Sequence, residues 1–230
     1  MIITNSVTML EITENGGTIY PTLISGDGHL VLVDAGFPGQ TDAIMQAIAE
    51  AGFRAEELTE IIITHQDFDH IGCLRDLLNL APKAKVLAHI EEAPYIDGNK
   101  TPAKLAARLA EYDTLSDEMK ARCDSQKELY PKLTAAVTQT LTDGEVLPCC
   151  GGIEIIHTPG HTPGHICLYL RESRVMVGGD TLNISDGHIT GPNPQHTYDM
   201  ELGLKSFEKA KAYDFRGLIS YHCGYLEILK

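Results

Sequence analysis

Four apolar runs in this sequence are each followed within a few residues by a histidine or an aspartate. The runs and the polar residues that follow them are IIIT before His65, IEIIHTPG before His161, VMVGG before Asp180 and GLISY before His222. In layered α/β proteins, the ends of buried strands bring distant side chains together at one edge of the sheets, on a rigid base. The pattern therefore predicts an α/β chain whose polar site is assembled from all four places.

The sequence around these runs predicts strands near both ends of the chain. The first third contains β-rich runs at 7–12, 18–24 and 30–33, separated by the turn signals NGG and SGDG, which favours an antiparallel meander. Further strands are predicted at 61–63, 85–88, 146–147, 153–157, 166–170, 175–177 and 218–221. Apolar residues at helical spacing predict helices near 43–48, over 70–80 and over 200–212. Strands and helices alternate as in α/β folds.

Residues 91–133 differ from the rest of the chain. They are rich in Lys, Glu, Ala and Leu, they show no strand signal, and Leu105, Leu109 and Tyr112 fall on one helical face. We predict a helical insertion here, within a single domain spanning 1–230, since the 43% hydrophobic content suffices for one core. A homodimer through an apolar surface of this insertion is a further hypothesis.

The densest polar cluster is THQDFDHIG, residues 64–72, at a predicted strand–helix junction. It offers two imidazoles and two carboxylates within six positions, and bound metal satisfies such groups well. The alternative is that Asp67 and Asp69 cap the helix that begins near His70, since aspartate is a preferred cap and favours the helix dipole. Capping does not account for His161, Asp180 and His222, so we favour metal binding.

The order of HxxxDH, TPGHTPGH, GGD and a late histidine resembles the metallo-β-lactamase superfamily along almost the whole chain. The resemblance implies that family's four-layer αββα sandwich, an α/β (α+β) fold of two mixed sheets with helices outside and metals at one edge of the sheet interface. It also implies two divalent metal ions. The first would take His65, Asp67 and His161, the second would take Asp69, His70 and His222, and Asp180 would bridge both.

One position departs from the usual HxHxDH motif of the family, because Asp67 stands where a histidine is usual. With a carboxylate there, two divalent ions and a bridging hydroxide against three aspartates sum to roughly zero charge rather than plus one. Oxygen ligands of this kind shift preference from zinc towards iron or manganese, although histidine-rich surroundings still suit zinc. We expect zinc first, with iron or manganese as alternatives.

Several neighbouring residues receive roles from their positions. Asp34, in LVDAG, resembles a family position that orients the metal ligands, with a turn residue as the alternative. His165 resembles the family's second histidine of TPGH, which is usually buried and hydrogen-bonding rather than ligating. We expect His157 to be a packing residue and Cys223 to lie outside the site, since free cysteines are commonly small core residues.

The implied chemistry is hydrolysis by a metal-bridging hydroxide, without a covalent enzyme intermediate. Asp69 and Asp180 would hold the metals, and one of them would also orient the hydroxide or pass its proton to the leaving group. Substrate contacts are expected from the insertion and from the loop after Asp180. The candidates in that loop are His188, Asn193, His196 and Tyr198, each with a solvated loop side chain as the alternative.

The expected substrate is a small molecule with an ester, lactone or related bond. We favour these over a phosphodiester because no Lys/Arg cluster lies near the motifs in the sequence to hold phosphate. A di-iron redox protein acting on oxygen or nitric oxide is the alternative class, and a non-catalytic sensor is a third.

Charge and cysteine content limit the partners and the compartment. The formal net charge is −14, from 32 acidic and 18 basic residues, so nucleic acid and anionic membranes would be repelled. The sequence shows no secretory signal and no membrane-spanning run, and its six cysteines form no CxxC pair. These features favour a cytoplasmic protein with reduced thiols.

Overall fold

The computed structural model describes residues 1–14 and 17–228, so Asn15 and Gly16, part of the predicted NGG turn, lie outside the described residues. A seven-stranded sheet has the order β1 (Ile2–Thr4), β2 (Val7–Met9), β5 (Thr22–Gly26), β6 (His29–Val33), β7 (Glu60–Ile62), β8 (Lys85–His89) and β9 (Gln139–Leu141). A six-stranded sheet has the order β10 (Val146–Leu147), β11 (Ile153–His157), β12 (Ile166–Leu170), β13 (Val175–Val177), β16 (Gly217–Ser220) and β17 (Gly224–Glu227). Both sheets are mixed, because β6 to β9 pair in parallel, β13 pairs with β16 in parallel, and the other pairs are antiparallel.

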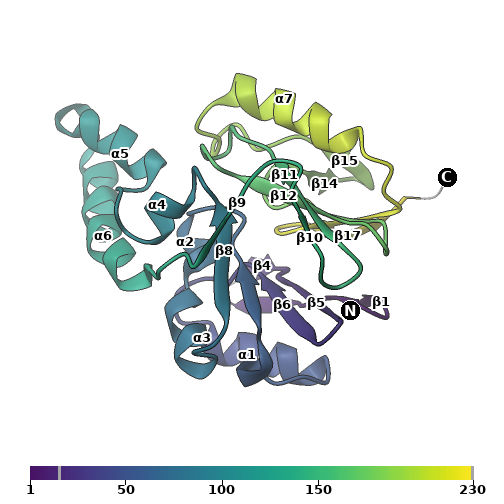
Figure 1. Ribbon diagram of the computed structural model, residues 1–230. Helices are drawn as coiled ribbons and strands as arrows, with labels where there is room; N and C mark the ends of the chain where they lie inside the picture. Colours follow the sequence, from purple (N-terminus) through teal and green to yellow (C-terminus); the bar gives the residue numbers. More distant parts are fainter. Residues whose placement is uncertain (15–16, 229–230) are drawn as a thin grey trace.

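Helices cover the outer faces of both sheets (Figure 1). α1 (Thr41–Glu50) and α3 (Leu74–Leu80) lie on the first sheet, and α7 (Met200–Lys211) lies on the second. The short elements η1 (Ala55–Glu57) and α2 (Phe68–Ile71) belong to the first half. The αββα sandwich implied by the family resemblance is therefore confirmed.

The alternation of side chains along one strand shows how the layers form. In β6, Leu30 and Leu32 pack in the core shared with α1 and α3, whereas Val31 and Val33 pack between the two sheets. All four side chains are buried, as expected for a strand covered on both faces. A third core lies between the second sheet and α7.

The segment from 93 to 133 is helical, in line with the prediction for 91–133. It contains α4 (Ala93–Ile96), α5 (Ala103–Ala110), η2 (Tyr112–Thr114) and α6 (Asp117–Leu133). These helices stand together at one side of the sandwich, on the left in Figure 1. They thereby form a wall beside the ends of the strands that carry the polar residues.

Several predicted elements are divided in the structure. The run 7–12 is split into β2 and β3 (Ile12–Glu14), and the run 18–24 into β4 (Gly17–Ile19) and β5, because β3 and β4 form a separate hairpin. The hairpin of β14 (Asn183–Ser185) and β15 (His188–Thr190) was not predicted. The predicted helix 70–80 is divided into α2 and α3.

The break between α2 and α3 has a physical reason. Gly72 donates its backbone N–H to the carbonyl of Gly36 at 2.8 Å, so the helix opens to admit the loop after β6. A Cβ at Gly72 would lie 2.3 Å from the backbone carbon of Phe37, which only a glycine avoids. This approach fixes the loop that carries Asp34 against the metal motif.

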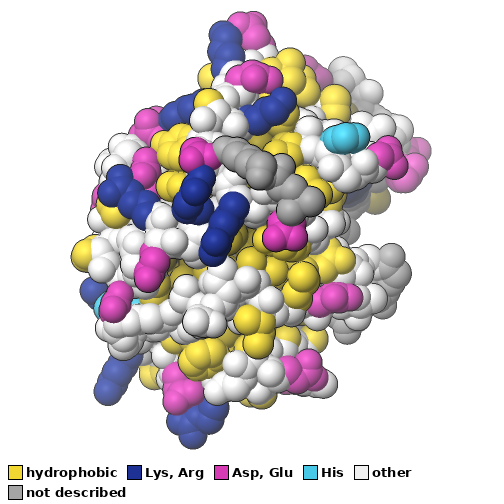
Figure 2. All heavy atoms as spheres, turned by 90° about the vertical axis from the view of Figure 1, so that its right-hand side faces the viewer, with side chains coloured by type: hydrophobic (Ala, Val, Ile, Leu, Met, Phe, Trp, Pro, Cys, Tyr) yellow, Lys and Arg dark blue, Asp and Glu magenta, His cyan; other side chains and the backbone are white. Residues whose placement is uncertain are grey.

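The homodimer through an apolar surface of the helical segment stays a prediction. Among the described residues, the exposed large apolar side chains are Met1, Ile2, Ile90, Tyr198, Leu202 and Leu204, and none of them lies within 91–133. On the side turned away from α5 and α6, charges of both signs are scattered among apolar side chains (Figure 2). No helix in the described part of the chain has the length and apolar character needed to cross a bilayer.

Candidate metal centre

Adjacent parallel strands bring Asp34 and Thr64 to one edge of the first sheet, since Asp34 follows β6 and Thr64 follows β7. Thr64 donates its backbone N–H to Asp34 Oδ1 and its hydroxyl to Asp34 Oδ2, both at 2.8 Å. His70 Nδ1 lies 2.9 Å from Asp34 Oδ2, and His65 Nδ1 lies 3.0 Å from the Thr64 hydroxyl. These contacts hold the Nδ1 side of both rings, so that both Nε2 atoms face the centre, and Asp34 takes the orienting position that the resemblance implied.

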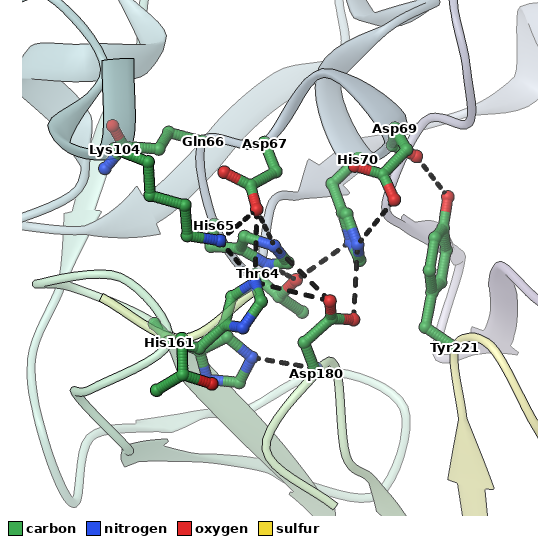
Figure 3. A network of polar contacts seen from close by, with 12 residues as sticks. Thr64, His65, Gln66, Asp67, Asp69, His70, Lys104, His161, Asp180 and Tyr221 are labelled. Carbon is green, nitrogen blue, oxygen red and sulfur yellow. Dashed lines mark hydrogen bonds and ion pairs between the residues drawn. The ribbon is translucent and has the colours of Figure 1, made fainter. Parts of the chain in front are cut away.

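The carboxylate of Asp180, which follows β13, divides its two oxygens between two pairs of histidines; Figure 3 shows three of these rings, those of His65, His161 and His70, around it. Asp180 Oδ2 lies 3.3 Å from His161 Nε2 and 4.0 Å from His65 Nε2. Asp180 Oδ1 lies 3.3 Å from His70 Nε2 and 3.4 Å from His222 Nε2. Asp69 joins the second pair, with its Oδ2 at 3.7 Å from His70 Nε2 and 3.4 Å from His222 Nε2.

The donor atoms fit metal ions. Within each of two groups, His65 with His161 and Asp180, and Asp69 with His70 and His222, the possible ligand atoms all lie within 4.8 Å of one another. His65 Nε2, His70 Nε2 and Asp180 Oδ1 are buried and lack any hydrogen-bond partner among the described residues. A buried polar atom without a partner is costly, and coordination of a cation removes that cost.

Asp67 occupies the N-cap position of α2, but its side chain makes no capping hydrogen bond, and Asp69 lies in the first turn of that helix. Asp67 Oδ2 instead lies 3.1 Å from His161 Nε2 and 3.5 Å from His65 Nε2. Lys104, at the start of α5, donates to the same oxygen, and its Nζ lies 2.8 Å from His161 Nε2. Figure 3 shows the ammonium between Asp67 and His161. A lysine from the helical segment therefore enters the first metal position.

The pKa values reflect this dense charge. Burial raises the pKa of Asp67, but Lys104 and His161 outweigh it and leave that pKa well below 3.8. Burial lowers the pKa of His70, yet the carboxylates of Asp34 and Asp180 raise it well above 6.5. Burial lowers the pKa of His222, but the carboxylates of Asp180 and Asp69, each 3.4 Å from its Nε2, outweigh it and raise that pKa to about 10. Metal ions would have to displace protons from these rings, so metal binding must depend on pH.

Gln66, between the two predicted ligands His65 and Asp67, ties the helical segment to the site. Its Oε1 accepts the backbone N–H of Ala103 at 2.6 Å, and its Nε2 donates to Glu92 Oε1 at 2.8 Å. Glu92 is fully buried and also accepts the backbone N–H of Gly164 at 2.7 Å. Burial raises the pKa of Glu92 to about 7, against the hydrogen bonds from Gln66. The motif residues thus hold α5, and with it Lys104, over the metal position.

Three further aromatic residues have clear places. His165 is fully buried, and its Nε2 accepts the backbone N–H of Asp180 at 3.0 Å, which agrees with the expected hydrogen-bonding role. Burial lowers its pKa well below 6.5, so the ring is neutral. His157 stacks on His89 at 3.9 Å. Tyr221 donates to the Asp69 carbonyl at 2.6 Å and lies against the His70 ring.

A cavity of about 620 Å³ opens over the metal ligands. Of the predicted substrate residues, Asn193 and His196 line it, whereas His188 and Tyr198 are not among its lining residues. Cys223, which we expected outside the site, lines the cavity and is exposed.

The cavity contains the basic cluster that the motifs in the sequence did not indicate. Lys104, Arg108 and Arg122 line it, although no basic cluster lies near the motifs in the sequence. They were missed because folding brings α5 and α6 to the site from a segment remote from the motifs. Asp67 was the available signal, because an additional buried carboxylate requires a compensating cation.

Comparison with known proteins identifies the family of this chain. The family model described as "Metallo-beta-lactamase superfamily" matches residues 15–219. A probable metallo-hydrolase of Bacillus subtilis is 28% identical over 226 residues, covering 89% of this chain and 79% of that protein. An N-acyl homoserine lactonase of a Bacillus species is 28% identical over 179 residues, covering 75% of this chain and 57% of that protein. The chain spans 62% and 53% of the length of two further relatives from Bacillus subtilis.

Solved structures share the fold. A metallo-beta-lactamase family protein from Thermus thermophilus superposes with a TM-score of 0.77 at 23% identity, covering 99% of this chain and 76% of that one. A metallo-beta-lactamase from Elizabethkingia meningoseptica superposes with a TM-score of 0.66 at 18% identity, covering 96% and 76%. Together with the family match and the strand-end histidines and aspartates, these likenesses show that the chain belongs to the metallo-beta-lactamase superfamily, as a metal-dependent hydrolase.

Proposed function

We propose that this hydrolase is dinuclear and cleaves an ester, lactone or related bond in a small molecule. The observation that carries the proposal is the division of the Asp180 carboxylate, with one oxygen towards His65 and His161 and the other towards His70 and His222. A carboxylate placed in this way can bridge two cations.

The residues that would hold the first ion are His65, Asp67, His161 and Asp180, and those for the second are Asp69, His70, His222 and Asp180. When bound, two divalent ions supply a hydroxide near neutral pH and polarise the substrate oxygen. The histidine-rich donor set suits zinc, and the carboxylates leave iron and manganese as alternatives.

Residues of the protein itself would orient the hydroxide and transfer the proton. Asp180 is held through its backbone by His165, and Asp69 is held through its carbonyl by Tyr221. Both carboxylates stand beside the cavity, so either can orient the attacking hydroxide or pass a proton to the leaving group. His222, which is 35% exposed, marks the side of the second position that faces the cavity.

The bond class is supported by similarity to N-acyl homoserine lactonases, whose name specifies a lactone substrate. The cavity volume of about 620 Å³ suits a small molecule. A phosphodiester hydrolase is the second candidate, because Lys104, Arg108 and Arg122 line the cavity and guanidinium groups bind phosphate well.

The test loads purified protein with zinc, iron or manganese and combines elemental analysis with a panel of chromogenic esters, lactones, thioesters and phosphodiesters. We expect two ions per chain and turnover of an ester or lactone. Asp180→Ala should lose metal and turnover together, whereas Asp113→Ala, which removes an exposed acid of η2, should change neither. An Asp180→Ala protein that keeps two tightly bound ions and full activity would contradict the bridging role, and turnover of phosphodiesters alone would favour the second candidate.

A further inference from the structure

Two arginines, Arg108 and Arg122, form a cationic wall of the cavity. Arg108 lies on α5 one turn after Lys104, and Arg122 lies on the adjacent helix α6. Both line the cavity, together with Gln126 and Tyr130 from α6. Because Lys104 and Arg108 are four residues apart in one helix, they share a face, about 6 Å apart at their Cβ atoms.

Neither arginine of this wall has a close acidic partner among the described residues. No carboxylate in the described part of the chain lies within 4.0 Å of the guanidinium of Arg108 or Arg122, and the same holds for Arg75 and Arg216, whereas the remaining three arginines each have an acidic partner. The hydrogen bond of Arg108 goes to a neutral group, from Nη1 to Gln126 Oε1 at 3.2 Å. Of these four arginines without an acidic partner in the described structure, Arg108 and Arg122 are the two that line the cavity.

Part of the wall is held in place. Arg108 is half-buried and the Gln126 side chain that accepts its hydrogen bond is buried, so the guanidinium is fixed from behind. Lys104 differs from the arginines in having an acidic partner, because it donates to Asp67. A planar guanidinium presents paired N–H donors that match a carboxylate or phosphate.

We propose that Arg108 and Arg122 form a subsite for an anionic group of the substrate. This inference rests on the proposed hydrolytic function and specifies its substrate class, an ester or lactone that also carries a carboxylate or phosphate. The anionic group lies about one helical turn beyond Lys104, so a spacer of a few atoms separates it from the bond that is cleaved. The arginines would bind the negatively charged oxygens of either a carboxylate or a phosphate.

The experiment compares a neutral and an anionic ester with the same leaving group, p-nitrophenyl acetate and p-nitrophenyl glutarate monoester, on the metal-loaded protein. Arg108→Met removes the charge but keeps the apolar stem, and Arg122→Met does the same on α6. The matched control is Arg75→Met, an exposed arginine of α3 that does not line the cavity.

For Arg108→Met or Arg122→Met, we expect kcat/KM for the anionic ester to fall about tenfold to a hundredfold, as for a lost hydrogen bond to a charged group. The neutral ester should change less than threefold, and Arg75→Met should leave the ratio of the two kcat/KM values unchanged. Equal effects on both esters, or none, in both cavity variants would overturn the subsite.

Direct binding separates this inference from the proposed function. Calorimetric titration with glutarate and with methyl phosphate measures anion affinity without turnover, and the difference between the two probes identifies the preferred anion. Affinity that falls in Arg108→Met while no ester is hydrolysed would retain the subsite and refute the hydrolytic proposal. Hydrolysis with arginine-independent anion affinity would refute the subsite alone.

Discussion

Replacing Lys104 with methionine should strengthen binding of the first metal ion. The ammonium of Lys104 lies 2.8 Å from His161 Nε2 and also donates to Asp67. His161 Nε2 has one lone pair, so it can accept from the ammonium or bind a metal ion, but not both. Methionine keeps much of the aliphatic stem, removes this competitor and removes a positive charge beside a cation site. Both changes act in the same direction.

The magnitude follows from the contacts. A hydrogen bond to a charged group contributes about 1.5–3 kcal/mol, and the Lys104 side chain is only 15% exposed, so solvent replaces it poorly. Taking about 2 kcal/mol for the interaction that the metal ion must displace gives a roughly thirtyfold gain in affinity. Loss of charge repulsion adds to this gain.

The assay is a competition titration of zinc against a chromophoric chelator, with metal content measured after dialysis. The wild-type protein should show a tight and a weaker ion, and Lys104→Met should tighten only the weaker one. Lys100→Met, which removes an exposed charge just before α5, is the control and should leave both affinities unchanged. In a His65→Ala background, which removes a first-site ligand, Lys104→Met should have little effect. An unchanged or weaker first ion in Lys104→Met would refute the reasoning.

Three further predictions follow from contacts around the site. Asp34→Ala removes the partner of His70 Nδ1 and should weaken the second metal ion about tenfold to a hundredfold in the same titration. The pKa of Glu92 is raised from 4.5 to about 7, so the folded protein keeps this proton to a higher pH than the unfolded chain does, and the free energy of unfolding should fall by about 3 kcal/mol as pH rises across that interval. Denaturant unfolding of Glu92→Gln should show a flatter dependence on pH. An equal dependence in the variant and the wild type would contradict the raised pKa of Glu92. Gly160→Ala places a Cβ 2.2 Å from the backbone nitrogen of Gly203 at φ +130° and should destabilise by about 3 kcal/mol or more in thermal unfolding, whereas Gly144→Ala, with nothing within 4 Å, should cost about 1–2 kcal/mol.

The strand-end pattern made much of the site predictable. His65, Asp180 and His222 each follow a buried strand, and parallel pairing of β6 with β7 and of β13 with β16 brings such ends to one edge. The apolar runs indicate where each strand ends, because a strand covered on both faces has few polar residues before its end. The buried role of His165 was likewise predictable from its place in TPGH.

The contribution of α5 and α6 was not predictable from local pattern. Lys104 and Asp67 are 37 residues apart, and Arg122 lies on a different helix from Arg108. In the sequence these cations resemble the solvent-exposed face of amphipathic helices. Helical periodicity identifies the apolar face of a helix, but it does not show what the polar face contacts. The contact between Lys104 and Asp67 depends on Gln66. The side-chain amide of Gln66 accepts a hydrogen bond from Ala103 and donates one to Glu92, and this fixes where α5 begins.

Asp67 and Lys104 are best understood as one unit. A neutral histidine at the position of Asp67 would leave the site with roughly one more positive charge, and the aspartate removes it. Lys104 donates a hydrogen bond to the same carboxylate, and its ammonium restores the positive charge. While Lys104 stays paired with Asp67, the metal-loaded centre would keep roughly the net charge of the usual motif, with one positive charge on a lysine side chain rather than in the ligand set.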